Sequence, residues 1–226
     1  VVVGIGPFNA PLLLNGKKLA PALAAGNSFI LKPSPYTPLA ALLFAEILEE
    51  AGLPAGVLSV IPTTDDAMGD TLFSDHRVKL ITFTGSARVG RFLAELAGRY
   101  QKRIVLELGG KSPLVILADA DLDYAVRSAA FGIFFNQGQV CMANSRIIVE
   151  APIYEAFCEA FAEKVKQVPF GDPALEHMAV GPLIDANQVS FIQNHINDAV
   201  SKGASLVTGG QAIGNVLEPS VLVDVE

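Results

Sequence analysis

One cysteine in this sequence has the setting of a nucleophile. Cys141 follows an apolar stretch and lies among small and polar residues, in the run Gly138-Gln139-Val140-Cys141-Met142-Ala143-Asn144. A thiol attacks as the thiolate, so it needs a base or a group that lowers its pKa, and backbone amides at such a turn can stabilise an oxyanion. Taken alone, a cysteine is more often a small buried hydrophobe. The hypothesis therefore depends on what the rest of the chain supplies.

Two further residues can supply a base and an amide donor. Glu107 ends an apolar strand-like run and precedes Gly109-Gly110, where partial burial would raise the pKa of its carboxyl group and make it a general base. The alternative is a strand-end carboxylate that bonds to the backbone. Asn9 follows Pro7-Phe8 near the start, and its side-chain amide can complete an oxyanion hole. Its alternative is an Asx turn.

Composition narrows the class of protein. The 226 residues are 51% hydrophobic and 17% charged, with a formal net charge of -7 and a pI near 5.0. An acidic chain argues against nucleic acid as a partner. No apolar run reaches the roughly 18 residues of a membrane span and no signal peptide is evident, so we predict no membrane partner and a cytoplasmic location. Two cysteines do not make a disulfide framework, and no metal site is predicted.

Strand-like and helix-like segments alternate in the first half of the chain. This alternation predicts an α/β fold with a doubly wound, mostly parallel sheet, whose ligands bind where strands end and helices begin. The loops at residues 5–9, 32–37 and 84–87 are therefore the expected edges of the site. Strands are expected at residues 1–5, 28–32, 57–61, 79–84 and 103–108, and helices at 12–25, 38–52 (capped by Thr37), 65–73 and 87–98.

The Gly109-Gly110 pair marks the expected domain boundary. We predict a cofactor-binding domain at residues 1–110 and a second α/β catalytic domain at residues 111–226. In the second domain, strands are expected at 113–117, 145–149 and 205–208, helices at 121–135, 153–168 and 187–202, and a terminal strand after them. Cys158 lies beside the apolar stripe of its helix and is interpreted as a packing residue. Both ends of the chain look cut, so we expect a segment of a longer protein.

Five blocks of sequence together resemble the aldehyde dehydrogenase superfamily, in the family's order and over essentially the whole chain. They are Pro7-Phe8-Asn9, Lys32-Pro33-Ser34, Phe83-Thr84-Gly85-Ser86, Leu106-Glu107-Leu108-Gly109-Gly110-Lys111-Ser112-Pro113, and Phe135-Asn136-Gln137-Gly138-Gln139-Val140-Cys141. The resemblance implies NAD(P)-dependent oxidation of an aldehyde to a carboxylic acid. Cys141 would add to the aldehyde carbon, while Asn9 and the Cys141 amide hold the oxyanion. Hydride would pass to nicotinamide, and Glu107 would activate the water that hydrolyses the thioester.

The resemblance also implies which residues contact NAD or NADP. Lys32 would meet the adenosine ribose or a phosphate on it, and Ser86 with the following helix start would meet the pyrophosphate. Ile5, Pro7 and Phe8 would line the nicotinamide side. The full set of expected cofactor contacts is Ile5, Pro7, Phe8, Lys32, Ser34, Pro35, Phe83, Thr84, Gly85, Ser86, Val89, Leu108 and Gly109. Gly4-x-Gly6 lacks the third glycine and the following acidic residue of a dinucleotide fingerprint, and we reject it as one.

The sequence departs from the family pattern in three places. Phe8 stands where many members have Trp, which keeps an aromatic wall. Pro35 stands where strongly NAD-preferring members place a Glu against the ribose hydroxyls, so we predict that NADP is tolerated or preferred. The family's downstream Glu-x-Phe-Gly-Pro block and its subunit-pairing tail do not occur in these residues. The resemblance implies a homo-oligomer, dimer or tetramer, for the full-length protein.

Other readings stay open on the sequence alone. The chain could be a catalytically incomplete fragment or pseudoenzyme that binds nucleotide or a partner without turnover. A cysteine hydrolase would need His76, His177 or His195 beside Cys141, and none lies in a recognisable motif. Transfer of the thioester to coenzyme A would not be expected to need Glu107. Phe8, Phe134, Phe135 and Met142 could wall a pocket for an aromatic aldehyde of the benzaldehyde or vanillin type, or could be core.

Overall fold

A computed structural model of the chain describes residues 1–64, 70–175 and 177–225. The chain divides into two compact units, Val1–Gly109 and Gly110–Glu226. The division falls one residue before the expected domain boundary. Among the helices of the described ranges, none is long and apolar enough to cross a membrane.

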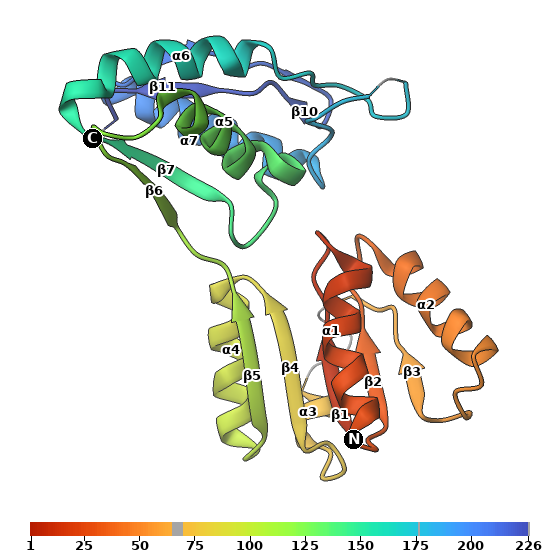
Figure 1. Cartoon of the computed structure of the whole chain (residues 1–226). Helices are drawn as coiled ribbons and strands as arrows, with labels where there is room; N and C mark the ends of the chain where they lie inside the picture. The colour runs from red at the N-terminus through yellow and green to blue at the C-terminus, as the bar shows by residue number, and fades with distance from the viewer. Residues whose placement is uncertain (65–69, 176, 226) are drawn as a thin grey trace. The chain divides into compact units, whose positions relative to one another are not determined.

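The first unit is built on a five-stranded sheet in the order β3-β2-β1-β4-β5. Every pair in it is parallel, as the alternation of strands and helices predicts (Figure 1). Its strands are β1 (Val2–Ile5), β2 (Phe29–Lys32), β3 (Leu58–Val60), β4 (Leu80–Gly85) and β5 (Arg103–Leu108). The chain builds outward from β1 in both directions, which makes the sheet doubly wound. The predicted fold class is confirmed.

Helices cover both faces of this sheet. On one face, α1 (Pro11–Ala24) and α2 (Pro38–Glu50) enclose a core that includes Val2, Leu19 and Leu31. On the other, α3 (Thr71–Ser74) and α4 (Ala87–Arg99) enclose a core that includes Val3, Ile81 and Leu93. The neighbours Val2 and Val3 belong to opposite cores because successive strand side chains point to opposite faces. Strands β1 and β2, which are covered on both sides, are accordingly mostly apolar, whereas β5 alternates between exposed and partly buried residues.

Two helices of this unit differ in detail from the predictions. Thr37 precedes α2, with Pro38 at the first helical position, but its side chain does not cap the helix. Its hydroxyl instead donates a hydrogen bond to the carbonyl oxygen of Phe8 at 3.4 Å. The helix predicted at 65–73 lies partly outside the described residues, at positions 65–69, and its described part, α3, extends to Ser74.

The second unit is also α/β. Strands β6 (Ser112–Ile116) and β7 (Asn144–Val149) pair in parallel. Helices α5 (Leu122–Phe134) and α6 (Tyr154–Lys166) pack with them around a core that includes Ile116, Ala129 and Phe161. After α7 (Ala186–Ser201), β8 (Ser205–Thr208) pairs antiparallel with the predicted terminal strand, β11 (Val221–Val223).

Three features of the second unit differ from the predictions. Helix α5 ends at Phe134, and a 3₁₀ segment, η2 (Phe135–Gly138), follows it. A short 3₁₀ segment, η3 (Ala151–Ile153), precedes α6, which is shorter than the predicted helix. The short hairpin of β9 (Ala212–Ile213) and β10 (Val216–Leu217) was not predicted, because two-residue strands carry too little alternation to be detected.

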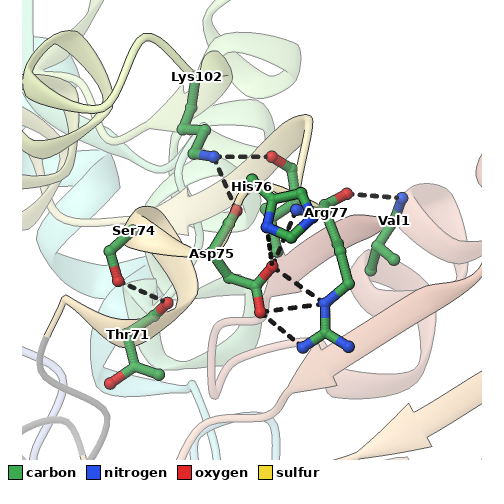
Figure 2. A network of polar contacts seen from close by, with 8 residues as sticks. Val1, Thr71, Ser74, Asp75, His76, Arg77 and Lys102 are labelled. Carbon is green, nitrogen blue, oxygen red and sulfur yellow. Dashed lines mark hydrogen bonds and ion pairs between the residues drawn. The ribbon is translucent and has the colours of Figure 1, made fainter.

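A polar network fixes the amino end of β4 in the first unit (Figure 2). The carboxylate of Asp75 accepts hydrogen bonds from the backbone and guanidinium nitrogens of Arg77, with Nη2 and Oδ2 2.6 Å apart. Lys102 Nζ donates to the carbonyl oxygens of Asp75 and Val78, at 2.8 and 3.0 Å. These bonds hold the turn from which β4 enters the sheet, so they fix the strand whose other end contributes to the candidate site.

The Asp75 carboxylate should make the stability of the protein depend on acid pH. Hydrogen bonds from the Arg77 side chain and backbone hold the pKa of Asp75 well below its usual range. A carboxyl pKa lowered on folding contributes stability above the unfolded-state pKa of about 3.9, and this contribution is lost as the pH falls below it. Asp75→Asn should therefore lower the thermal midpoint at pH 7 and have a smaller effect near pH 3. A midpoint difference that does not shrink between these pH values would contradict the assignment.

Candidate active site

The predicted site residues of the first unit lie at one edge of its sheet. The parallel register places Ile5 beside Lys32 on one side and beside Phe83 on the other. It also pairs Thr84 with Glu107 and Gly85 with Leu108. Because the carboxyl ends of parallel strands meet at the same edge, the loops after β1, β2 and β4 and the end of β5 converge there. The predicted convergence of these loops is confirmed, and the roles of their residues stay predictions.

Glu107 shares this edge with a buried lysine that the sequence analysis did not single out. Lys18, on α1, is only 8% exposed, and its ammonium donates hydrogen bonds to the hydroxyl groups of Thr82 and Thr84 on β4. Thr84 is the register partner of Glu107, so the two side chains share a face of the sheet. Burial lowers the pKa of Lys18, and the negative charge of Glu107 opposes that shift. The Lys18 ammonium thus lies close enough to Glu107 for the two charges to interact.

Glu107 itself is exposed, which corrects the expectation of partial burial. The physical reason lies in its position. Strand β5 is the last strand of the sheet, and Gly109 and Gly110 have no side chains that could cover its end. On the same face two residues earlier, Val105 is 46% exposed. The carboxylate therefore lies where water can reach it.

The loop that carries Asn9 is held by contacts on two sides. Gly6, at its start, lies against the side chain of Asn15, which is fully buried on α1. A Cβ atom on Gly6 would come within 1.9 Å of Asn15 Oδ1, so only glycine fits. On the other side, the ring of Phe8 contacts Tyr36 edge-on, with centroids 6.4 Å apart. Asn9 follows at half-buried depth, directly before α1.

The loop after β2 is packed against this one and contains the lysine expected to contact the cofactor ribose. Lys32 is 4% exposed and Ser34 8%, whereas Pro35 is exposed. The Ser34 hydroxyl accepts a hydrogen bond from the Tyr36 amide at 3.3 Å, which shapes the turn. Lys32 is therefore buried at the end of its strand and is not a solvated surface lysine.

The start of α4 has the geometry of an anion site. Ser86 caps the helix, and its hydroxyl accepts a hydrogen bond from the Val89 amide at 3.3 Å. The first backbone N–H groups of a helix have no partner within the helix and point toward an incoming anion. The position fits the predicted pyrophosphate contact at Ser86.

The apolar residues among the predicted cofactor contacts differ in how deeply they are buried. Phe83 is 5% exposed and belongs to the core beneath α4, because its position on β4 directs its side chain to that face. Its ring reaches the position of Gly85, where an added Cβ would lie 2.4 Å from Phe83 Cζ, and its contact with the cofactor stays a prediction. Ile5, Val89 and Leu108 are partly buried against the same core, while Pro7 is half-buried and Gly109 is exposed.

Cys141 lies in the second unit, in an exposed turn between η2 and β7. The three residues that begin this turn have left-handed backbone conformations, with φ of 50° at Asn136, 58° at Gln137 and 70° at Gly138. Such conformations cost roughly 1–3 kcal/mol at each non-glycine residue and persist only where the surroundings enforce them. Cys141 is therefore exposed by a turn whose backbone conformation is unfavourable and needs stabilising contacts.

The remaining cysteine and two of the histidines have contacts that explain them without catalysis. Cys158 is half-buried on α6, and burial raises the pKa of its thiol, which disfavours the thiolate. His195 Nδ1 lies 2.9 Å from the carbonyl oxygen of Phe191 in its own helix. His76 is exposed beside Asp75 in the first unit. These contacts weaken the cysteine hydrolase alternative. Among the described residues, no group of three or more His, Cys, Asp or Glu could hold a metal ion.

Comparison with known proteins places the whole chain in one family. Residues 1–226 match the family described as the aldehyde dehydrogenase family. A vanillin dehydrogenase of Pseudomonas fluorescens is 44% identical over 229 residues, an alignment that covers 100% of this chain and 48% of the relative. The chain thus spans about half the length of the curated relatives that it matches.

Solved structures agree with this match. The crystal structure of an E. coli NADP-dependent enzyme superposes with a TM-score of 0.96 at 40% identity, covering all of this chain and 48% of that one. A salicylaldehyde dehydrogenase from Pseudomonas putida G7, solved with salicylaldehyde, gives 0.95 at 39% identity, covering all of this chain and 47% of that one. The α/β architecture derived above is therefore shared with enzymes of this family.

The close approach of Gly6 and Asn15 can be tested by adding one methyl group. Gly6→Ala places a Cβ where Asn15 Oδ1 already lies. We expect it to lower the free energy of unfolding by about 1–3 kcal/mol, the usual effect of overpacking. Gly98→Ala is the matched control, because nothing lies within 4 Å of its added Cβ on α4, and it should be neutral or stabilising by up to about 1 kcal/mol. Equal denaturant midpoints for the two variants would contradict the contact.

Proposed function

Because the chain belongs to the aldehyde dehydrogenase family, we propose that the full-length protein oxidises an aldehyde to a carboxylic acid with NAD or NADP as the hydride acceptor. The observation that carries the proposal is that the match covers residues 1–226 with Cys141, Glu107 and Asn9 all present.

The protein's own residues take three roles in this reaction. The Cys141 thiolate forms a bond to the aldehyde carbon, and the carbonyl electron pair moves onto oxygen. The Asn9 side-chain amide and the Cys141 backbone N–H stabilise the oxyanion that results. Glu107 takes a proton from water, whose oxygen attacks the thioester carbon and expels the thiolate. The product is a carboxylic acid, and the cysteine is regenerated.

The residues at the sheet edge are suited to hold the cofactor that this chemistry needs. The amino end of α4 would bind its pyrophosphate, and Lys32 would contact the adenosine ribose or its phosphate. When bound, the nicotinamide cofactor supplies the hydride acceptor that converts the aldehyde adduct of Cys141 into a thioester.

We further propose that the substrate is an aromatic aldehyde. In the segment before Cys141, Phe131 and Phe135 are 67% and 51% exposed, and their ring centroids lie 5.1 Å apart. Met142, next to the nucleophile, is 74% exposed. By contrast, Phe134 packs against the core of the second unit and is a weaker candidate for the pocket wall. The names of two compared proteins, a vanillin dehydrogenase and a salicylaldehyde dehydrogenase, support an aromatic substrate.

The proposed activity can be tested in the full-length protein by following reduced cofactor with a panel of aromatic and aliphatic aldehydes. Cys141→Ala should abolish turnover, and Cys158→Ala is the matched control that should retain it. Glu107→Gln should give a burst of about one equivalent of reduced cofactor and then little turnover, because the thioester forms but is not hydrolysed. Activity that survives in Cys141→Ala would overturn the mechanism. No activity with any aldehyde would favour the alternative of a pseudoenzyme that binds nucleotide without turnover.

We also propose that the cofactor site accepts NADP. The exposed residue after Ser34 is Pro35, and no acidic residue follows before Glu46, so nothing on this loop repels a ribose phosphate. Pro35→Glu should lower kcat/KM with NADP by about tenfold or more, because like-charge contacts at a binding surface are costly. Pro35→Gln is the neutral control and should have a much smaller effect. The absence of detectable turnover with NADP in the unmodified protein would refute the proposal.

A further inference from the structure

The turn that carries Cys141 is hydrogen-bonded to a segment 45 residues later in the chain. Gln139 Oε1 accepts a hydrogen bond from the Ile184 backbone amide at 2.9 Å. When the Gln137 carboxamide is oriented so that both its atoms find partners, its nitrogen donates to the Asn136 carbonyl at 3.0 Å and its oxygen accepts from the Gly181 amide at 3.1 Å. Two glutamines of the turn therefore bond to the backbone of residues 181–184.

Residues 181–184 are themselves held in place by burial and by a backbone hydrogen bond. Gly181 and Leu183 are buried, and the Leu183 amide donates to the Asn215 carbonyl at 2.8 Å. Within the turn, the Gln139 amide donates to the Asn136 carbonyl at 2.9 Å and the Ala143 amide to the Val140 carbonyl at 3.1 Å. The turn thus has a backbone hydrogen bond on each side of Cys141, and the side chains of Gln137 and Gln139 connect it to residues 181–184.

From this arrangement we infer that Gln139, supported by Gln137, is a positioning residue for the nucleophile. The left-handed conformations of Asn136 and Gln137 are unfavourable and need external bonds to persist. Gln139 lies two residues before Cys141, so its bond to Ile184 fixes the direction of the Cys141 thiol and backbone N–H. The inference deepens the proposed function and rests on it in one respect, the assignment of Cys141 as the nucleophile.

The inference can be tested by comparing two reactions of Cys141 in the full-length protein. Acylation by p-nitrophenyl acetate builds an oxyanion and needs the backbone N–H in place, whereas alkylation by iodoacetamide does not. The ratio of the two rate constants therefore reports orientation and cancels differences in thiolate population. Labelling at Cys141 is resolved from that at other cysteines, Cys158 among them, by mass spectrometry of peptides. Neither reaction consumes cofactor, so the result is independent of aldehyde oxidation.

Three variants separate positioning from a general loss of structure. Gln139→Met removes the acceptor for the Ile184 amide and should lower the acylation-to-alkylation ratio by about tenfold to a hundredfold, the size of effect that misplacement of a reacting group produces. Gln139→Glu keeps an acceptor oxygen and should stay within about threefold of the unmodified protein. Gln188→Met, at an exposed position on α7, is the matched control and should leave the ratio unchanged. An unchanged ratio in Gln139→Met, or an equal fall in Gln139→Glu, would overturn the inference.

A measurement on the unmodified protein applies even if Gln139→Met does not fold. The Ile184 amide should be protected from hydrogen exchange to the level of other hydrogen-bonded amides in the unit, such as Leu183. Exchange of Ile184 at the rate of an unprotected amide would overturn the inference. Cys141→Ala that retains aldehyde oxidation would refute the proposed function instead, and would leave this bond and its protection as measured.

Discussion

Parallel strand pairing is the constraint on which the first unit depends. Because β1, β2, β4 and β5 all run in one direction, each ends at the same edge, and the four segments that follow them meet there. No single segment forms the candidate cofactor edge. Asn9, Lys32, Ser86 and Glu107 are separated by many residues in sequence, yet the register of the sheet places them at or just after the carboxyl ends of neighbouring strands. The chemistry expected of this edge therefore depends on the sheet keeping its register, which its two apolar cores enforce.

In the second unit, the turn between α5 and β7 leaves Cys141 exposed. The left-handed residues of η2 turn the chain sharply after α5, and the side chain of Gln139, which follows them, accepts a hydrogen bond from the Ile184 amide. Backbone strain and side-chain anchoring thus occur together, as they do where a reactive group must be both accessible and oriented.

The sequence predicted the fold better than the local details, and particular residues show why. Helices and strands of the first unit follow from periodicity and from Gly and Pro at their ends, which are local signals. Thr37 was expected to cap a helix but bonds to Phe8, 29 residues away. Lys18 was only a helix lysine in the sequence, yet it bonds to Thr84, 66 residues away. The turn at Asn136 and Gln137 likewise depends on residues 181–184. Contacts between residues so far apart in the sequence leave no pattern in a short stretch of it.

The contact between Gly6 and Asn15 also limits how this chain can vary. The two residues share one small volume, since any side chain at position 6 would occupy the space of the Asn15 amide. Substitutions at these positions are therefore not independent, because a residue larger than glycine at position 6 can be accepted only after Asn15 has been replaced by a smaller residue. The order of such changes is fixed, since position 15 must change before position 6.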